Sequence, residues 1–409
     1  MLQRSRGTIR AGLVLAATLG ACDDSGNAQS NDYAPSEEKG DIFGKDGRVE
    51  RYKLETDDPR YEFARSSAAL VRGGDVLTPS PQGAWSVEAP TLGQLENLCE
   101  GEKFAEQLTP AWCSATLVAA DLVLTAGHCL TSQEDLEASS APVRAACSET
   151  KVVFDFAYDS RDADLSEIPA ANVYQCIEVV AHEYFKSRAP SADYAILKLD
   201  RPVLDRTPVG VRDGGTHVRV GAAVTQIGHP SGIPQKIVDS VVTEAVPCQS
   251  FGYVGASFPG NSGGGVFDLN TGTVAGVTTR NPGVHYRPDG ARGCNVAAVC
   301  EEHDDCTVPW TTAYGTSAML PRLTPFVREK LRIVENGGPS GCGEPEGSVD
   351  TGDDDDALDS CEAHCWDLSL PVFATFECLD ACEASPECVE NCAGGSWNSR
   401  VPCILACGS

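Results

Sequence analysis

Three residues far apart in the chain have side chains of the types that nucleophilic catalysis needs. His128 lies in a Thr-Ala-Gly-His-Cys segment, Asp193 precedes the run Tyr-Ala-Ile-Leu-Lys-Leu, and Ser262 precedes three glycines. A serine hydroxyl keeps its proton at neutral pH, so it becomes a nucleophile only beside a base that a third group orients. We therefore predict that His128 takes the proton from Ser262, and that Asp193 orients and stabilises the imidazole.

The residues beside the serine suit the negative charge that develops on the substrate in such a reaction. Gly260 stands two positions before Ser262, and the backbone N–H groups of both are predicted to point at the developing oxyanion. Loss of one such donor typically raises the barrier by about 2.7–4 kcal/mol. Gly260 and Ser262 are therefore the candidate oxyanion hole.

The order histidine, aspartate, serine, at separations of 65 and then 69 positions, is itself informative. Together with Trp112–Val118, the three segments resemble the chymotrypsin-like serine peptidases over about residues 66–326. The resemblance implies a mainly β fold of two antiparallel six-stranded β-barrels with a C-terminal helix. It also implies serine endopeptidase activity through an acyl-enzyme, protein or peptide substrates, no cofactor, and a disulfide between Cys113 and Cys129.

Several segments of this sequence resemble one branch of this family more than the others. Asn261 stands where digestive peptidases have the aspartate that captures a new N-terminal ammonium, so that activation switch is expected to be absent. The Gly-Asn-Ser-Gly-Gly segment, Ile227–Gly232 and Asp41–Arg48 are similar to bacterial glutamyl endopeptidases. The last match suggests that Asp41–Arg65 belongs to the domain and is not a discarded propeptide.

The residues that the resemblance assigns to the substrate pocket leave its preference open. Ala256 stands where trypsin has an aspartate, which disfavours cleavage after Arg or Lys. Ser257 can supply a hydroxyl as in glutamyl endopeptidases, but Thr278 replaces the histidine that binds a substrate carboxylate there. Arg280 either replaces that charge or is a surface residue. Glutamate on one hand, and small or apolar side chains on the other, are the two alternatives.

The elements that must position these residues are short strands. Apolar and β-branched runs alternate with Gly, Pro and Asp, a pattern typical of a β-sandwich or barrel. One helix is predicted from Leu320 to Val334, where it would close the domain. The runs are Ser114–Leu124, Lys151–Phe156, Tyr194–Leu199, Val218–Ile227 and Thr273–Val277.

Composition limits the function further. The 409 residues carry Lys+Arg 31 and Asp+Glu 59, a net charge of −28, which argues against a nucleic-acid ligand. Residues 343–409 hold 15 acidic residues and one Arg, which is half of that net charge. The 19 cysteines indicate an oxidising compartment.

The beginning of the chain predicts export and a lipid anchor. Three arginines precede the short apolar run Ala11–Cys22, as in a secretory signal. Its end, Leu-Gly-Ala-Cys, resembles a bacterial lipobox, which implies cleavage after residue 21 and acylation of Cys22; an ordinary cleaved signal is the alternative. Residues 22–40 are predicted to be a disordered tether that follows the lipid anchor. We expect a monomeric lipoprotein of the bacterial envelope, anchored to a membrane, with 18 cysteines left to pair.

The end of the chain predicts a separate small domain. The peptidase-like domain spans 41–342, and 343–360 is an acidic linker whose run Asp353–Asp356 lacks the spacing of a calcium loop. Residues 361–409 contain eight cysteines in Cys-x-x-x-Cys pairs, which place both members on one helix face and favour helical hairpins clamped by disulfides over a zinc site. The favoured pairs are Cys361–Cys382, Cys365–Cys378, Cys388–Cys407 and Cys392–Cys403.

The sequence leaves an alternative function and the partners of several cysteines open. A binding or adhesion lipoprotein on an inactive peptidase-like scaffold is the alternative to an enzyme, although an intact histidine, aspartate and serine argue against it. Histidines elsewhere fit no metal spacing and are expected to be structural, so no metal is predicted; they are His182, His217, His229, His285 and His303. Eight cysteines in 41–342 have no predicted partner: Cys99, Cys147, Cys176, Cys248, Cys294, Cys300, Cys306 and Cys342.

Overall fold

A computed structural model describes most of residues 42–334. The described ranges are 42–43, 46–74, 76–131, 141–185, 192–213, 217–247, 249–280, 284–300 and 311–334. The predicted signal, tether, acidic linker and cysteine-rich C-terminal domain lie outside them, with Cys22 and the predicted C-terminal disulfides. In the described part, no helix is both long and apolar enough to cross a bilayer.

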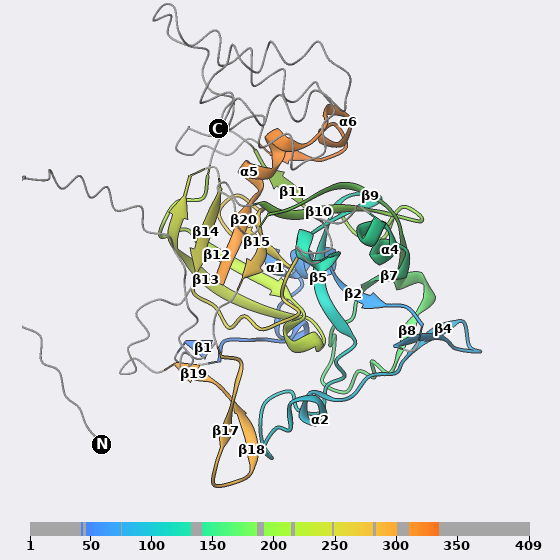
Figure 1. Cartoon of the computed structure of the whole chain (residues 1–409), viewed down its shortest axis with the longest axis vertical. Helices are drawn as coiled ribbons and strands as arrows, with labels where there is room; N and C mark the ends of the chain where they lie inside the picture. Colours follow the sequence, from blue (N-terminus) through green and yellow to red (C-terminus); the bar gives the residue numbers. More distant parts are fainter. Residues whose placement is uncertain are drawn as a thin grey trace, which may run out of the picture.

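Six antiparallel strands close the first barrel (Figure 1). They are β2 (Ser67–Arg72), β5 (Ala111–Ala119), β6 (Leu122–Thr125), β7 (Thr150–Phe154), β9 (Val173–Phe185) and β10 (Ala192–Leu199), in the order β10-β6-β5-β2-β7-β9. Alternate side chains point inward, and Leu70, Leu117, Val152 and Leu197 are fully buried in its core.

The second barrel closes because β15 pairs with strands on both of its sides. Its strands are β15 (Gly265–Asp268), β12 (Ala223–Gly228), β13 (Lys236–Val246), β14 (Ser250–Tyr253), β20 (Thr311–Gly315) and β16 (Thr273–Arg280). Two short parallel strands, β11 (Gly210–Arg212) and β21 (Ile333–Val334), extend the sheet beyond β16. The prediction of two antiparallel six-stranded barrels is confirmed.

Aromatic side chains join the two barrels into one core. The rings of Phe63 and Phe267 are stacked with centroids 4.8 Å apart, and those of Tyr194 and Tyr314 with centroids 5.7 Å apart. Because Tyr194 follows Asp193 and Phe267 lies on the strand after Ser262, this packing fixes the candidate site between the barrels.

Two local predictions were wrong. The run Ser114–Leu124 is not one strand but the hairpin β5–β6. The region 320–334 is not one helix: it contains η5 (Leu320–Arg322), α6 (Pro325–Arg328) and then β21. Proline disfavours a helical conformation in the preceding residue, and Thr324 is accordingly extended, with φ −59 and ψ 149. A short helix, α5 (Thr316–Met319), precedes η5.

The segment before the first barrel is held by the second barrel and by buried ion pairs. Val49 and Ile237 exchange two backbone hydrogen bonds of 3.0 Å. Arg51 and Arg206 each bond the Asp155 carboxylate at 2.8 Å. Burial alone would raise the pKa of Asp155, but the hydrogen bond from Arg206 and the positive charges of both arginines outweigh burial and lower that pKa.

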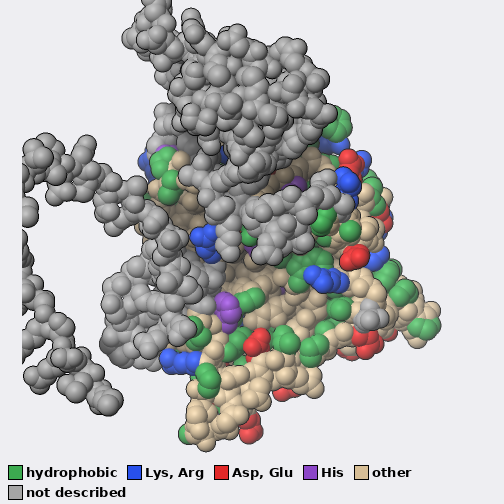
Figure 2. Space-filling view, viewed as in Figure 1, with side chains coloured by type: hydrophobic (Ala, Val, Ile, Leu, Met, Phe, Trp, Pro, Cys, Tyr) green, Lys and Arg blue, Asp and Glu red, His purple; other side chains and the backbone are tan. Residues whose placement is uncertain are grey.

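The remaining elements are short and lie around the barrels, and three disulfides reinforce them. The helices are η1 (Arg51–Lys53), α1 (Pro59–Ser66), α2 (Leu92–Glu96), η2 (Gly127–Cys129), α4 (Ala141–Glu149), η3 (Ala170–Asn172) and η4 (Pro230–Gly232). The strands are β1 (Ile42–Phe43), β3 (Leu77–Pro79), β4 (Ala84–Val87), β8 (Glu167–Pro169), β17 (Tyr286–Asp289), β18 (Cys294–Ala297) and β19 (Val299–Cys300). The disulfides are Cys99–Cys294, Cys113–Cys129 and Cys147–Cys176. Acidic and basic side chains of the described part are interspersed on the face shown in Figure 2.

Candidate active site

His128 and Asp193 meet through two hydrogen bonds, although they come from different elements. His128 lies in η2, directly after β6, and Asp193 near the start of β10, which pairs with β6. His128 Nδ1 is 2.8 Å from Asp193 Oδ2, and the His128 backbone N–H donates to Asp193 Oδ1 at 3.0 Å. A carboxylate only accepts, so Nδ1 carries a proton and Nε2 of the neutral ring is left as an acceptor.

The sequence before His128 suits this close approach. A Cβ atom on Gly127 would lie 2.3 Å from the carbonyl oxygen of Glu183 in β9, so only glycine fits there. His182 donates from Nε2 to the Gly127 carbonyl at 3.0 Å. Burial lowers the pKa of His182, which favours its neutral form. This predicted structural histidine therefore supports the turn that carries His128.

The loop around Ser262 has a conformation that requires glycine on both sides. Gly260 and Gly263 have φ of +92 and +83, and a Cβ on Gly260 would lie 2.3 Å from a backbone carbonyl oxygen. Within 260–264, the N–H groups of Asn261, Gly263 and Gly264 donate to backbone carbonyls. Among the hydrogen bonds of the described residues, none uses the N–H of Gly260 or of Ser262 as donor. These are the two amides predicted to form the oxyanion hole.

A disulfide brings the serine loop next to the histidine. Cys113 and Cys129 are bonded, as the resemblance implied, and the Cys129 sulfur lies 3.7 Å from the Ser262 carbonyl oxygen. The described contacts contain no hydrogen bond between the Ser262 hydroxyl and His128, a contact that is often long in unliganded sites. The sulfurs lie near His128, but each is bonded to the other, so neither is a thiolate that could hold a metal.

The predicted pocket residues Ser257 and Thr278 meet at a buried polar group that the sequence analysis missed. Gln226 Nε2 lies 3.2 Å from both hydroxyl oxygens. The Tyr253 hydroxyl is 2.8 Å from Thr278 Oγ1. All four side chains are buried. A glutamine between Thr225 and Ile227 on an otherwise apolar strand was the available signal for this cluster.

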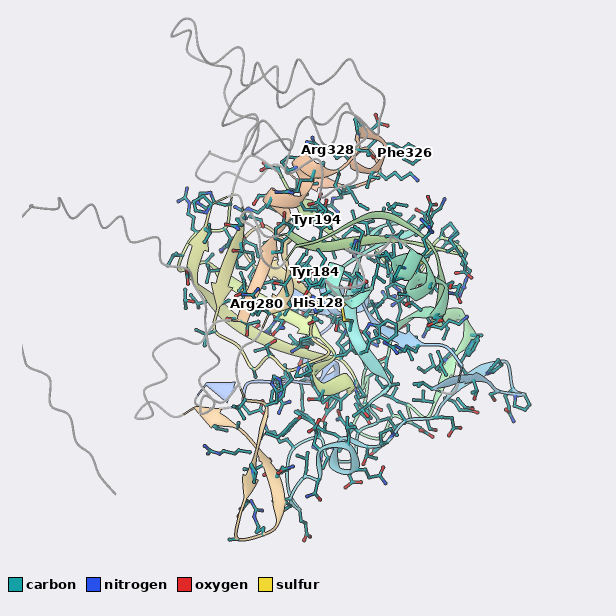
Figure 3. All side chains as sticks on the ribbon, viewed as in Figure 1. His128, Tyr184, Tyr194, Arg280, Phe326 and Arg328 are labelled. Atoms are coloured by element: carbon teal, nitrogen blue, oxygen red, sulfur yellow. A yellow bond between two sulfur atoms is a disulfide. The ribbon has the colours of Figure 1, made fainter. Side chains whose placement is uncertain are left out.

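Ala256 lies apart from this polar cluster, and Arg280 lies near the histidine. Ala256 is buried in a small apolar cluster with Phe258. Figure 3 shows Arg280, Tyr184 and His128 close together, with the Tyr184 and His128 ring centroids 5.9 Å apart. Burial raises the pKa of Tyr184, the negative charge of Asp193 raises it further, and the positive charge of Arg280 lowers it. The field of the exposed arginine thus reaches the site.

One family model matches part of this chain, and solved structures are similar to it. Residues 113–277 match the family model described as the trypsin-like peptidase domain. A solved structure of a Glu endopeptidase in complex with MPD is similar over 70% of this chain and 99% of that chain, at 15% identity and a TM-score of 0.39. The VesB protease of Vibrio cholerae is similar over 64% of each chain, at 13% identity and a TM-score of 0.37. No curated protein matches the chain. The matched range includes His128, Asp193 and Ser262.

Proposed function

We propose that this chain, whose residues 113–277 match the family model of the trypsin-like peptidase domain, is a serine endopeptidase that acts through His128, Asp193 and Ser262. One observation carries the proposal: both oxygens of the Asp193 carboxylate accept hydrogen bonds from His128, one from Nδ1 and one from the backbone. This arrangement orients the imidazole and leaves Nε2 as the base that a serine nucleophile needs.

The reaction then follows from the chemistry of these groups. Nε2 of His128 takes the proton as Ser262 Oγ attacks the scissile carbonyl carbon, and the carbonyl oxygen becomes an oxyanion facing the free N–H groups of Gly260 and Ser262. His128 gives its proton to the leaving amine as the peptide bond breaks. Water activated by the same histidine then hydrolyses the acyl-enzyme and restores Ser262.

Covalent labelling tests this proposal directly. A peptidyl phosphonate with a leaving group reacts only with an activated serine, so the folded protein should bind one phosphonate per molecule with loss of that leaving group. The modified residue, located by mass spectrometry, should be Ser262. A correctly folded protein that is not labelled would contradict the proposal and favour an inactive scaffold.

We further propose a preference for glutamate before the cleaved bond. The hydroxyls of Ser257 and Thr278 can donate to a substrate carboxylate, and Arg280 supplies a positive charge near the site. Replacing Arg280→Gln should lower kcat/KM for glutamate relative to alanine roughly fivefold, the effect of about 1 kcal/mol from one exposed charge.

A peptide set varied at this one position measures the preference. Arg328→Gln is the matched control, because Arg328 is also exposed but lies on α6, away from His128 (Figure 3). A preference for small or apolar residues that Arg280→Gln leaves unchanged would exclude the glutamyl specificity.

We also propose that Cys22 anchors the mature protein to a membrane of the bacterial envelope. The support is the lipobox-like end of the apolar run before Cys22. Several acyl chains on one residue hold a protein to a bilayer far more firmly than one chain does. Intact mass should show an acylated N-terminal cysteine in the membrane fraction, whereas Cys22→Ala should appear without acyl mass in the soluble fraction. Unmodified wild-type protein cleaved elsewhere would contradict the anchor.

A further inference from the structure

The N–H groups of Gly260 and Ser262, for which the described residues show no acceptor, are directed by the carbonyls of their own peptide groups. In a trans peptide the C=O and N–H point in opposite directions. The carbonyls of Pro259 and Asn261 accept main-chain N–H groups at 2.5 and 2.9 Å. These bonds fix the directions of the Gly260 and Ser262 N–H groups, each opposite to the carbonyl of its own peptide group.

The peptide group between those two is held at its N–H by the Phe258 carbonyl, at 3.1 Å, and at its carbonyl by a side chain. The Gly260 carbonyl accepts a hydrogen bond from Ser114 Oγ at 2.7 Å. The Ser114 backbone N–H also donates to the Ser262 carbonyl at 2.7 Å. Rotation of the peptide between Gly260 and Asn261 would turn both neighbouring peptide groups, so the Ser114 hydroxyl, together with the bond from the Asn261 N–H to Phe258, sets the relative direction of the Gly260 and Ser262 N–H groups.

Ser114 is in turn oriented by a histidine. Its side chain is fully buried, and its oxygen accepts the His229 backbone N–H at 2.9 Å and lies 3.2 Å from His229 Nδ1. A hydroxyl has one proton, and the shortest contact directs that proton to Gly260. The His229 backbone N–H is therefore a donor to Ser114, and the contact with Nδ1 is a second donation only in the Nδ1–H tautomer.

This donor chain does not change with pH in the working range. Burial, and then the positive charge of Lys236, lower the pKa of His229 to about 3. The ring is therefore neutral at any pH at which a serine and histidine pair operates, so its contact with Ser114 does not change with pH. His229 was predicted to be structural, and the geometry gives it a more specific role.

We infer that Ser114, oriented by His229, is a positioning residue that holds the Gly260–Ser262 loop in the conformation that binds the oxyanion. This inference rests on the proposed peptidase function. Neither side chain touches the reacting atoms. Their effect should appear in the stabilisation of the tetrahedral state and not in the binding of substrate.

The test is Ser114→Ala in the full-length protein. We expect kcat to fall about 10- to 100-fold with KM nearly unchanged, less than the roughly 10²–10³-fold loss on removing an oxyanion donor outright. Affinity for a peptide aldehyde should fall by the same factor, because Ser262 adds to the aldehyde carbon, its proton passes to His128, and the resulting oxyanion occupies the hole. Affinity for the corresponding product peptide should not change.

Two further variants separate positioning from stability. Ser67→Ala is the matched control: Ser67 is equally buried and donates to the Phe63 carbonyl at 2.9 Å, away from the serine loop. It should lower the melting temperature but keep kcat. His229→Phe keeps a ring against Phe156 while removing both ring nitrogens, and it should add little to the loss already present in Ser114→Ala.

The outcomes are distinguishable. The inference is wrong, and Ser114 is only a structural residue, if Ser114→Ala lowers kcat no more than Ser67→Ala does. It is also wrong if Ser114→Ala lowers the affinity for the aldehyde and the affinity for the product peptide by the same factor. If the wild-type protein neither turns over peptides nor reacts with the phosphonate, the proposed function itself fails, before any variant is compared.

Discussion

Replacing Ser262→Ala should lower kcat by about a millionfold, the size of effect seen when the nucleophile of a serine peptidase is removed. The expected reason is that no other described side chain is placed to form the acyl-enzyme. The fold should survive, because the described hydrogen bond of this residue is made by its backbone, to the N–H of Ser114. Turnover of a peptide substrate measures the loss of kcat, phosphonate labelling measures the loss of the nucleophile, and a melting curve measures whether the fold survives.

A matched serine elsewhere makes the result interpretable. Ser148 is exposed and donates only to the Ala145 carbonyl in α4, so Ser148→Ala should keep both turnover and labelling. If Ser262→Ala still reacted with one phosphonate per molecule, the nucleophile would be another residue.

Asp193→Asn is expected to lower kcat by about 10⁴-fold with little change in structure. An asparagine side chain has one acceptor and one donor where the carboxylate has two acceptors. If the asparagine oxygen keeps the hydrogen bond from the His128 backbone N–H, its NH₂ group faces Nδ1 of the ring. Nδ1 must then accept a hydrogen bond and cannot carry the proton. The proton moves to Nε2, and His128 can no longer take the proton from Ser262.

The measurement is kcat for the same peptide, with Asp200→Asn as the control. Asp200 also accepts a backbone N–H, from Gln175 at 3.1 Å, but directly follows β10, at the end opposite to Asp193. Turnover within tenfold of wild type in Asp193→Asn would show that the histidine does not depend on its carboxylate partner.

The pairing of His128 with Asp193 could be predicted from sequence because both residues lie in segments with distinctive composition. Asp193 lies at the start of an apolar strand and His128 after another, and antiparallel pairing of the two strands brings the side chains together. The single helix predicted after Leu320 failed because Pro325 sets the conformation of Thr324, a local effect that outweighs helical periodicity.

The polar groups behind the site could not be predicted, and the reason is physical. Ser114, Gln226 and His229 are buried polar residues in apolar surroundings. The sequence shows that such residues need partners, but their partners come from the other barrel or from loops more than 30 residues away. Register within one strand does not specify which distant carbonyl or hydroxyl a buried side chain meets.

The Cys99–Cys294 disulfide would determine how the products of self-cleavage behave if the proposed peptidase cuts its own copies. It joins positions 195 residues apart: Cys99 lies between α2 and β5, and Cys294 lies in β18. A single nick anywhere between them produces two fragments that stay covalently linked. Self-digested molecules would therefore run as intact protein until a reductant is added, and a nicked chain would keep both barrels beside each other.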